Sequence, residues 1–491
     1  MSAAVCALLL GTSCQNEDIV NQAATQEFTL KLDMGANSRT MMSENGPVWG
    51  NEEELYVVGD NGNSYGTLRM VWRSSDGKSA MFSGKITGDA SRLEHMVYPK
   101  PVDNQIQMNT LNGANYNAPM VGSIEDGEVV DLGYIGSLVS IELDGLKGAE
   151  IQNDPTGAKV IGGYYQFNPV NGTIEFKADQ NGTLTITNIP DDGIVYIPVH
   201  TTADQNSKET IYMQLTGVTP EGSDTQTDLG TPIVINANVA KNALVESNDN
   251  GFAFVGDEVV EYDVISDYEG FNTACTNGGV YKLGVDLNVG EDVTFVLKNG
   301  KEMILDLNGK KLSATSIKTG SNYNMFDVNG GTLTVMNGEM EYEHKGDNMM
   351  WNSSTNLFNV TAGGVLTLNG VTAKNLGGSD MGFVVHLNNW GEVTLNVESS
   401  TLESNYVAVR VFNSGYDMNN VTIKNSTLKG GNYAFWVHNY TLADFGTQEK
   451  VDAQKKLLNF DVSGNGNTFV GKNDTPVRYG MTDAVYSDDV N

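Results

Sequence analysis

Hydrophobic and polar residues alternate along most of this chain in short runs. Alternation with a period of two is the pattern of β-strands that bury one face, and the Asn-Gly, Asp-Gly and Gly-Gly pairs between the runs favour tight turns. The pattern predicts an all-β chain with strands at 28–32, 54–58, 69–72, 80–84 and 96–99, and again at 137–143, 183–186, 194–198 and 211–215. Polar stretches near 103–133 and 241–251 are expected to join the folded parts.

The C-terminal part of the chain repeats. Apolar-polar-apolar triplets recur at 305–307, 333–335, 366–368, 393–395 and 421–423, and their central positions are 28, 33, 27 and 28 residues apart. A second series lies at 326–328, 358–360, 385–387, 409–411 and 435–437. Such periods are typical of solenoids, whose coils are too small to bury a core alone and therefore stack. We expect a parallel β-helix with Asn ladders at its corners, interrupted by a lateral loop or short helix at 444–456.

The second series predicts an aligned column of side chains. If the apolar members of each triplet point inward, the residue between them points outward, and stacked coils place these residues about 4.8 Å apart. The five central residues are Asp327, Asn359, His386, Arg410 and Trp436. Trp rings stack on sugars and planar polar groups hydrogen-bond hydroxyls or carboxylates, so the column suits a glycan. The alternative is that any solenoid carries polar or aromatic residues outside and that Arg410 simply pairs with a neighbour.

Four further residues extend the expected ligand surface: Trp390, Tyr406, Tyr433 and His438. A catalytic role for the column would need a base together with several acids, and it offers one outward acid, Asp327. We therefore expect a binding protein and not an enzyme. The alternative, a β-helix lyase or hydrolase acting on surface polysaccharide, would have only Arg410, His386 and Asp327 as its machinery.

The N-terminus has the pattern of a bacterial lipoprotein. An apolar segment at 3–10 is followed by Leu10-Gly11-Thr12-Ser13-Cys14 and then by polar, acidic residues. The segment suits a signal peptide, because a membrane span needs roughly 20 apolar residues. The pattern predicts a signal peptide and lipobox at 1–14, a tether at 15–27, and lipidation of Cys14 that anchors the chain to a membrane. The alternative is an ordinary thiol at a disordered end.

Charge and cysteine content narrow the partners and the chemistry. The chain carries 61 acidic and 29 basic residues, a formal net charge of -32, and nucleic acids need clustered Lys and Arg, so we expect no nucleic-acid partner. With Cys6 in the signal segment and Cys14 acylated, Cys275 has no disulfide partner and is expected to be a small buried residue. The chain has only five His residues and lacks the common catalytic and phosphate-binding motifs, so no metal and no cofactor are expected. The stretch 60–63 resembles a calcium loop but lacks its closing acid and is expected to be a turn.

The first half of the chain resembles the fimbrillin family, the lipidated pilins and pilus accessory subunits of Gram-negative anaerobes. The likeness rests on an early strand followed in order by Arg39-Thr40, Trp49-Gly50, a strand with Trp72, Phe82-Ser83-Gly84 and Val97-Tyr98-Pro99. The resemblance implies two transthyretin-like β-sandwiches, at 28–132 and 133–245. It also implies protease cleavage after Arg39, which frees a groove that a strand of another pilus subunit fills. The alternative is that Arg39 lies in a solvated loop.

The repeats at 255–491 resemble the right-handed parallel β-helix of the pectate-lyase-like superfamily at the level of the fold. Together the two resemblances imply a surface-exposed lipoprotein of the outer membrane, with a fimbrium as the alternative location. Its expected role is that of a fimbrial accessory subunit or tip adhesin. Its β-helix would bind a glycan or a surface protein, and strand addition would join it to other pilus subunits.

Overall fold

The computed structural model describes residues 25–33, 41–43, 46–50, 53–113, 118–170, 172–179, 182–255, 257–298, 300–317, 323–345, 354–377, 382–389, 391–413, 419–439, 458–461, 466–472 and 476–479. Contacts divide the chain into two compact units, Met1–Phe254 and Val255–Asn491, and each is described by itself. Nearly all described secondary structure is β, as the alternation predicts. No helix in the described residues is long and apolar enough to cross a membrane.

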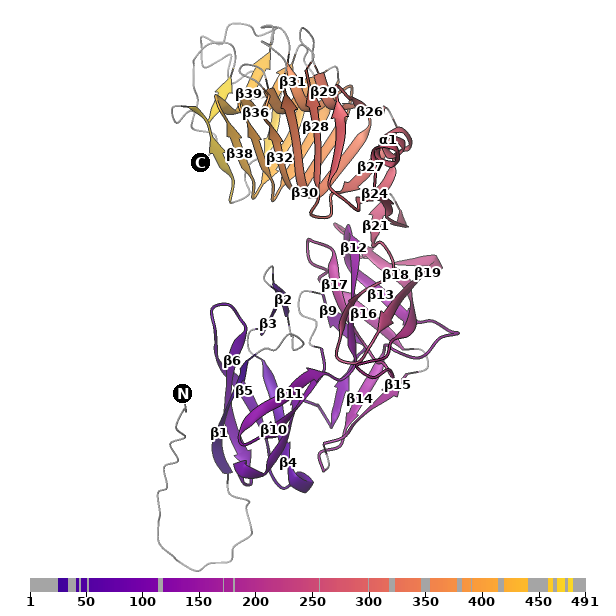
Figure 1. Ribbon diagram of the computed structural model, residues 1–491, viewed down its shortest axis with the longest axis vertical. Helices are drawn as coiled ribbons and strands as arrows, with labels where there is room; N and C mark the ends of the chain where they lie inside the picture. The colour runs from indigo at the N-terminus through magenta and orange to yellow at the C-terminus, as the bar shows by residue number, and fades with distance from the viewer. Residues whose placement is uncertain are drawn as a thin grey trace, which may run out of the picture. The chain divides into compact units, whose positions relative to one another are not determined.

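The N-terminal unit begins with one antiparallel sheet in the order β1-β6-β5-β4-β7-β10-β11 (Figure 1). Its strands are β1 (Thr25–Asp33), β4 (Glu54–Gly59), β5 (Tyr65–Arg73), β6 (Ser79–Thr87), β7 (Leu93–Tyr98), β10 (Met120–Glu125) and β11 (Glu128–Tyr134). The edge strands β1 and β11 contact each other, so the sheet curls around its apolar face. A separate hairpin, β2 (Met41–Ser43) and β3 (Gly46–Val48), precedes the fully buried Trp49.

Two short 3-10 turns complete this part, η1 (Asp60–Gly62) and η2 (Ala90–Arg92). The first confirms the turn expected at 60–63, because Asn61 has a positive φ of 54° within it.

The rest of the N-terminal unit contains three further sheets, in the orders β17-β12-β21, β19-β18-β13-β16-β9 and β15-β14-β8, with β20 also paired to β12. Their strands are β8 (Gln105–Gln107), β9 (Thr110–Asn112), β12 (Ser137–Asp144), β13 (Leu146–Asn153), β14 (Gly163–Phe167), β15 (Ile174–Ala178), β16 (Thr183–Thr187), β17 (Ile194–Val199), β18 (Glu209–Pro220), β19 (Thr227–Val239), β20 (Leu244–Glu246) and β21 (Phe252–Val255). Every strand that the alternation predicts in this unit is present, and β7 ends one residue earlier than expected, at Tyr98.

The polar stretch at 103–133, expected as a joint between the first two folded parts, is not a simple linker. It contains β8 and β9, at 105–112, which pair with β14 and β16 of the second part. The chain then returns to the first sheet through β10 and β11. Ile106 and Met108 alternate with polar neighbours, so this polar stretch can still bury one face against Val58, Val97 and Phe167. The supposed joint is part of the packed core between the two parts.

The C-terminal unit is a parallel β-solenoid, as the repeats predict. Each complete coil supplies three strand positions. The first holds β24 (Gly279–Leu283), β27 (Glu302–Asp306), the starts of β30 (Thr332–His344) and β32 (Val365–Asn375), then β34 (Val393–Glu398), β37 (Asn419–Lys424) and β40 (Leu458–Asp461). The second holds β25 (Leu287–Glu291), β28 (Lys311–Ser316), the ends of β30 and β32, then β35 (Thr401–Ser404), β38 (Thr427–Gly430) and β41 (Thr468–Val470).

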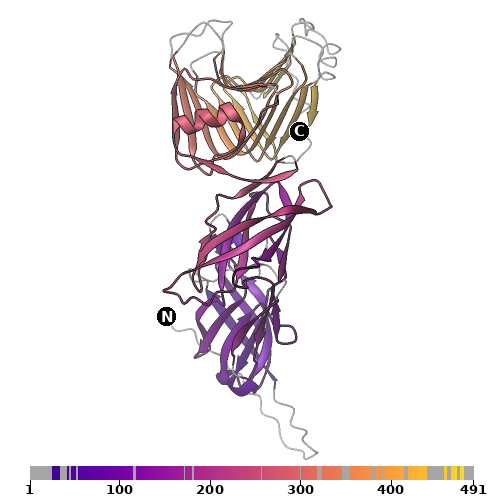
Figure 2. The same ribbon diagram turned by 90° about the vertical axis from the view of Figure 1, so that its right-hand side faces the viewer.

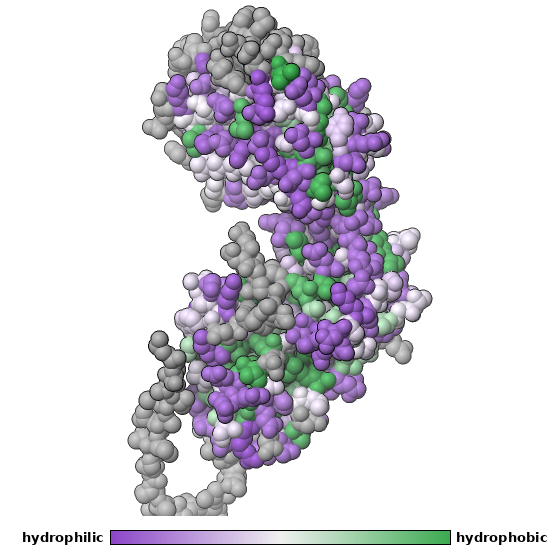
Figure 3. All heavy atoms as spheres, viewed as in Figure 1, coloured by the Kyte–Doolittle hydropathy of each residue, from purple (hydrophilic) through white to green (hydrophobic). Residues whose placement is uncertain are grey.

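The third position forms a separate seven-stranded sheet, which we call the third-face sheet. It contains β26 (Phe295–Lys298), β29 (Tyr323–Asn329), β31 (Thr355–Thr361), β33 (Gly382–Asn389), β36 (Val407–Asn413), β39 (Tyr433–Asn439) and β42 (Val477–Tyr479). All of its pairs are parallel and in register from coil to coil. Over the C-terminal unit, the view in Figure 3 shows mainly hydrophilic residues with scattered hydrophobic ones.

The Asn residues of the repeats lie where the first strand position turns into the second. Asn308, Asn337 and Asn425 have positive φ angles of 52°, 57° and 48°, and Gly370 has 63° at the equivalent corner. Asn and Gly tolerate this left-handed conformation better than other residues do. This requirement explains why Asn-Gly pairs recur along the solenoid sequence.

A helix covers the coil at which the solenoid begins (Figure 2). Helix α1 (Tyr268–Asn277) is capped by Asp267, whose side chain accepts from the Gly270 amide, and lies beside β25 and β26. It follows β22 (Glu258–Glu261) and β23 (Asp263–Ile265) and precedes β24 (Gly279–Leu283). Its Phe271 packs edge-on against Phe295 with ring centroids 4.8 Å apart. Cys275 of this helix is a free, buried thiol in the core, as expected, and burial raises its pKa.

Candidate functional site

The third-face sheet aligns the five residues of the predicted column. Strand register pairs each of them with the next one, coil by coil. The same register adds Arg478 of β42 beside Trp436. We call the following six residues the central column: Asp327, Asn359, His386, Arg410, Trp436 and Arg478. In β29, β31, β33, β36 and β39, the residues on both sides of the column member are buried in the solenoid core. The predicted alternation is therefore confirmed in these five strands.

The chemistry of the column changes along the solenoid. In the early coils it consists of one acid and one amide, and Asn359 Nδ2 donates to Asp327 Oδ1 at 2.7 Å. A parallel amide pair flanks it, with Asn356 Nδ2 donating to Asn324 Oδ1 at 2.6 Å. In the later coils the flanking residues are apolar or aromatic. The flanking positions there are held by Phe383, Val407, Tyr433 and Phe412.

Arg410 lies among three aromatic rings. Its guanidinium carbon is 5.1 Å from the ring centroid of Phe383, 4.9 Å from that of Phe412 and 4.8 Å from that of Trp436. A cation within about 6 Å of an aromatic face is attracted by the ring's electron density. Arg410 is therefore held in place by its neighbours on the same face.

Arg478 repeats this arrangement one coil further on. Its guanidinium carbon is 5.2 Å from the ring centroids of both Tyr433 and Trp436, and its Nη1 lies 3.4 Å from Tyr433 Oη. Trp436 thus lies between two cations. Tyr406 lies edge-on to Trp436 with centroids 6.3 Å apart. Burial raises the pKa of Tyr406, although Arg478 and Arg410 act in the opposite direction.

The structure corrects the expectation that the whole column is exposed. Asn359 is 8% exposed, and His386 and Trp436 are each 5% exposed. Neighbouring rings account for part of this burial, because Phe383 and Phe412 lie 5.4 and 6.2 Å from the His386 ring. The partly exposed groups of the later coils are Tyr406, Arg410, Phe412, Tyr433 and Arg478. His386 and Trp436 therefore support this surface from beneath instead of presenting their own faces.

The remaining predicted site residues are placed as follows. Cys14, Arg39 and Trp390 lie outside the described residues, as does the interruption at 444–456. The backbone of His438 pairs with that of Phe412 at the edge of the same face, and its side chain is outside the description. Within the described residues no group of three or more His, Cys, Asp or Glu side chains is arranged to hold a metal ion.

Sequence reasoning missed Arg478, Phe383 and Phe412. Arg478 stands between Val477 and Tyr479, which repeats the triplet pattern, but the long interruption of the period hid this last coil. Phe383 and Phe412 flank the predicted column at fixed positions in the strand and were detectable once the register was known.

No protein-family model matches this chain, and neither the curated proteins nor the solved structures include a significant match to it. The class that the fold defines is an all-β protein whose C-terminal unit is a parallel β-solenoid. Any function must therefore be argued from its own residues.

Proposed function

We propose that this chain is a surface lipoprotein that binds a glycan or a surface protein through the later coils of its β-solenoid. The observation that carries the proposal is the cluster of Arg410 and Arg478 among four aromatic rings. The chain has 61 acids and 29 bases, yet the described outward positions of this cluster carry cations and no carboxylate. Guanidinium groups bind carboxylates bidentately and aromatic rings contact sugar faces, so a carboxylate-bearing glycan fits this surface best.

The geometry does not favour catalysis by the column. Asp327 and Arg410 are three coils apart in register, which corresponds to about 14 Å at the usual strand spacing. A catalytic acid and base that act on one bond must both lie within hydrogen-bonding distance of the reacting atoms of the substrate. The proposal is therefore one of binding, and product release by the protein is the outcome that would contradict it.

The first test is a glycan array probed with the full chain, followed by titration of the best glycan against variants. Arg410→Ala should weaken binding at least tenfold, the order expected for losing a charge-assisted bidentate contact. The matched control is Lys374→Ala, which removes a cation from β32 in the other solenoid sheet, where Lys374 pairs in register with Glu341 and Glu403. Equal glycan affinities of the two variants would contradict the proposal. So would cleavage of the glycan by the wild type, seen as unsaturated or reducing-end products, that is lost in Arg410→Ala.

The proposal extends to the N-terminal unit as a fimbrial accessory subunit or tip adhesin. Its finer elements are two transthyretin-like sandwiches, a right-handed solenoid, acylation at Cys14 and cleavage after Arg39. The proposed strand exchange is supported by the position of β1. It is an edge strand whose backbone pairs with β6 over the full stretch from Thr25 to Asp33. Loss of that strand would leave the β6 edge open to strand addition from another pilus subunit.

Mass spectrometry of the native N-terminus from outer membranes tests this extension. A chain that begins at an acylated Cys14 supports a lipid anchor, and one that begins at Thr40 supports pilus assembly after cleavage. An unacylated Cys14 within a longer chain recovered from another compartment would contradict both.

A further inference from the structure

The small sheet β15-β14-β8 of the N-terminal unit has two different faces. On one face Ile106, Tyr165 and Phe176 occupy one register row and pack into the core between the two parts of the unit. On the other face the neighbouring row is Gln107, Tyr164 and Lys177. The Tyr164 ring thus lies between an amide and an ammonium group on the outer face, and it is partly exposed.

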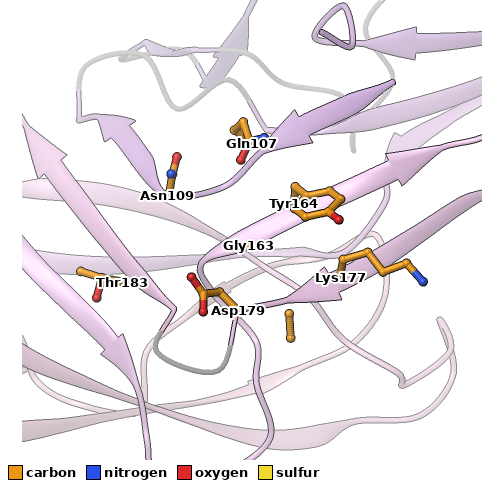
Figure 4. Close-up of a pocket in the computed structure, with 8 residues that line it drawn as sticks. Gln107, Asn109, Gly163, Tyr164, Lys177, Asp179 and Thr183 are labelled. Carbon is orange, nitrogen blue, oxygen red and sulfur yellow. The ribbon is translucent and has the colours of Figure 1, made fainter. Parts of the chain in front are cut away.

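A pocket of about 340 Å³ lies on this outer face (Figure 4). Its second wall comes from Asn109, Asp179 and Thr183, which lie just before β9, just after β15 and at the first residue of β16. In the view of Figure 4 these three lie on one side of Gly163, with Tyr164 and Lys177 on the other. The intervening Met108 is 5% exposed, and side chains alternate along an extended chain. This alternation directs both Gln107 and Asn109 outward.

The backbone beneath the pocket is fixed by glycines. Gly163 has a φ of +94°, and a Cβ there would lie 2.3 Å from the Lys177 carbonyl oxygen. A Cβ on Gly162 would lie 2.4 Å from Cα of Gly182. The Gly182 amide donates to the Asp179 carbonyl at 3.0 Å, and the Met108 amide donates to the Gly163 carbonyl at 2.9 Å. These contacts hold the two walls at a set separation before anything binds.

The lining groups match one class of ligand. They are an aromatic ring, two side-chain amides, a hydroxyl and a carboxylate, and the only lining cation, Lys177, forms an ion pair with Glu175. An anionic ligand would be repelled by Asp179, and the lining cation that could attract it, Lys177, is already paired with Glu175. A neutral sugar offers apolar C-H faces to Tyr164 and hydroxyls to the amides and the carboxylate.

We propose that this pocket binds a neutral sugar unit, a hexose or a disaccharide, independently of the solenoid. Its volume lies at the lower end of the range of about 300–1,000 Å³ for small-molecule sites, which suits one or two rings and excludes a longer buried chain. The pocket and the central column differ in charge and therefore in the sugars that they select.

Saturation-transfer difference NMR on the full chain tests the proposal with the methyl glycosides of glucose, galactose, mannose, N-acetylglucosamine and glucuronic acid, and with maltose and lactose. At least one neutral sugar should bind, and Tyr164→Ala should lower its affinity at least fivefold, while Tyr164→Phe stays within about twofold of the wild type. The matched control is Tyr212→Ala, because Tyr212 is 44% exposed on β18 and does not line the pocket. Gln107→Ala should weaken binding about threefold. Because Gln107 is exposed, this variant should fold even if Tyr164→Ala does not.

Three results would overturn the proposal: no neutral sugar binds, methyl glucuronide binds more tightly than every neutral sugar, or the tyrosine and glutamine variants bind as the wild type does. The variant Arg410→Ala separates the two proposals. If it leaves the neutral-sugar signal unchanged, the pocket stands whatever the solenoid does. If it abolishes that signal, the sugar belongs to the central column and the pocket proposal fails, although the proposed function does not.

Discussion

The two units bury their apolar residues in different ways. In the solenoid a core residue packs mainly on its counterpart one coil away, as in the row Phe295, Phe326 and Phe358, whose successive ring centroids are 5.7 and 5.6 Å apart. In the N-terminal unit Trp49 packs on Phe82 and Tyr98 from separate strands, with centroids 5.2 and 5.9 Å away. Stability in a solenoid is therefore nearly a sum of neighbouring interfaces, whereas the N-terminal core depends on several distant segments at once.

Replacement of Trp49 by Ala should produce the largest difference in stability between the two units. The side chain is fully buried, and removing a buried Trp or Phe costs about 3–5 kcal/mol in the free energy of unfolding. We expect the loss to destabilise the whole N-terminal unit, because Phe82 of β6 and Tyr98 of β7 lose their common partner. Calorimetry of the full chain should show the N-terminal transition shifted strongly downward and the solenoid transition unchanged.

Trp72→Ala provides the matched control. Trp72 is 48% exposed in β5, so its removal should change the free energy of unfolding by about 0.5 kcal/mol or less. A solenoid transition that moves together with the N-terminal one in Trp49→Ala would show that the two units unfold as one and would contradict the comparison.

The same contrast explains which parts of the fold were predictable. Equivalent positions in successive solenoid coils have the same burial, so the sequence pattern repeats from coil to coil. The triplets therefore predicted both the parallel coils and the register that pairs His386 with Arg410. In the N-terminal unit alternation predicted the strands, but it carries no information about distant partners. It could not predict that 105–112 leaves the first sheet to pair with β14 and β16.

An interior corner of the solenoid allows a second, more local test. Asn375 is fully buried, and its Nδ2 donates to the carbonyls of Thr355 at 2.9 Å and Phe383 at 2.8 Å, while its Oδ1 accepts from the Gly377 amide at 2.9 Å. Asn375→Ala leaves these groups unsatisfied and should cost about 2–3 kcal/mol. Hydrogen exchange should show the lost protection concentrated in β31, β32 and β33, because coils interact chiefly with their neighbours.

Asn396→Ala is the control for this corner. Asn396 is partly buried on the outer side of β34 and donates one long hydrogen bond, 3.3 Å, to Thr367 Oγ1, so we expect a change of about 0.5 kcal/mol or less. Loss of protection spread evenly over all coils in Asn375→Ala would show that the solenoid is a single cooperative block.

The candidate site was predictable in its alignment and not in its exposure. Period-two alternation determines on which side of a strand Trp436 lies, but not what its neighbours do. The burial of His386 depends on Phe383 of its own strand and on Phe412 of the next coil, and Trp436 is flanked by Tyr406 of the preceding coil. The pocket beside Tyr164 was not predictable at all, because Gln107, Tyr164 and Lys177 meet only through the pairing of three separate strands.

Mild acid should produce the smallest effect and should act on both units. In the N-terminal unit His200 stacks on Phe176 with centroids 4.4 Å apart, and in the solenoid His344 is 5% exposed. Burial lowers the pKa of both imidazoles. Glu209 opposes the shift and Lys241 adds to it for His200, and Asp292 opposes it for His344. A His pKa lowered by folding means that the unfolded chain binds the proton more readily.

Both contributions to stability are therefore complete above the unfolded His pKa of about 6.5 and decline as the pH falls below it. Melting of the full chain at about pH 7.5 and pH 5.5 should show both transitions shifted downward in acid, a range above the ordinary pKa values of Asp and Glu. The variant His200→Phe keeps the ring stack and should remove the shift from the N-terminal transition alone, whereas His344→Leu should remove it from the solenoid transition alone. If either variant changes the acid response of both transitions, or of neither, the two units do not titrate separately through these histidines.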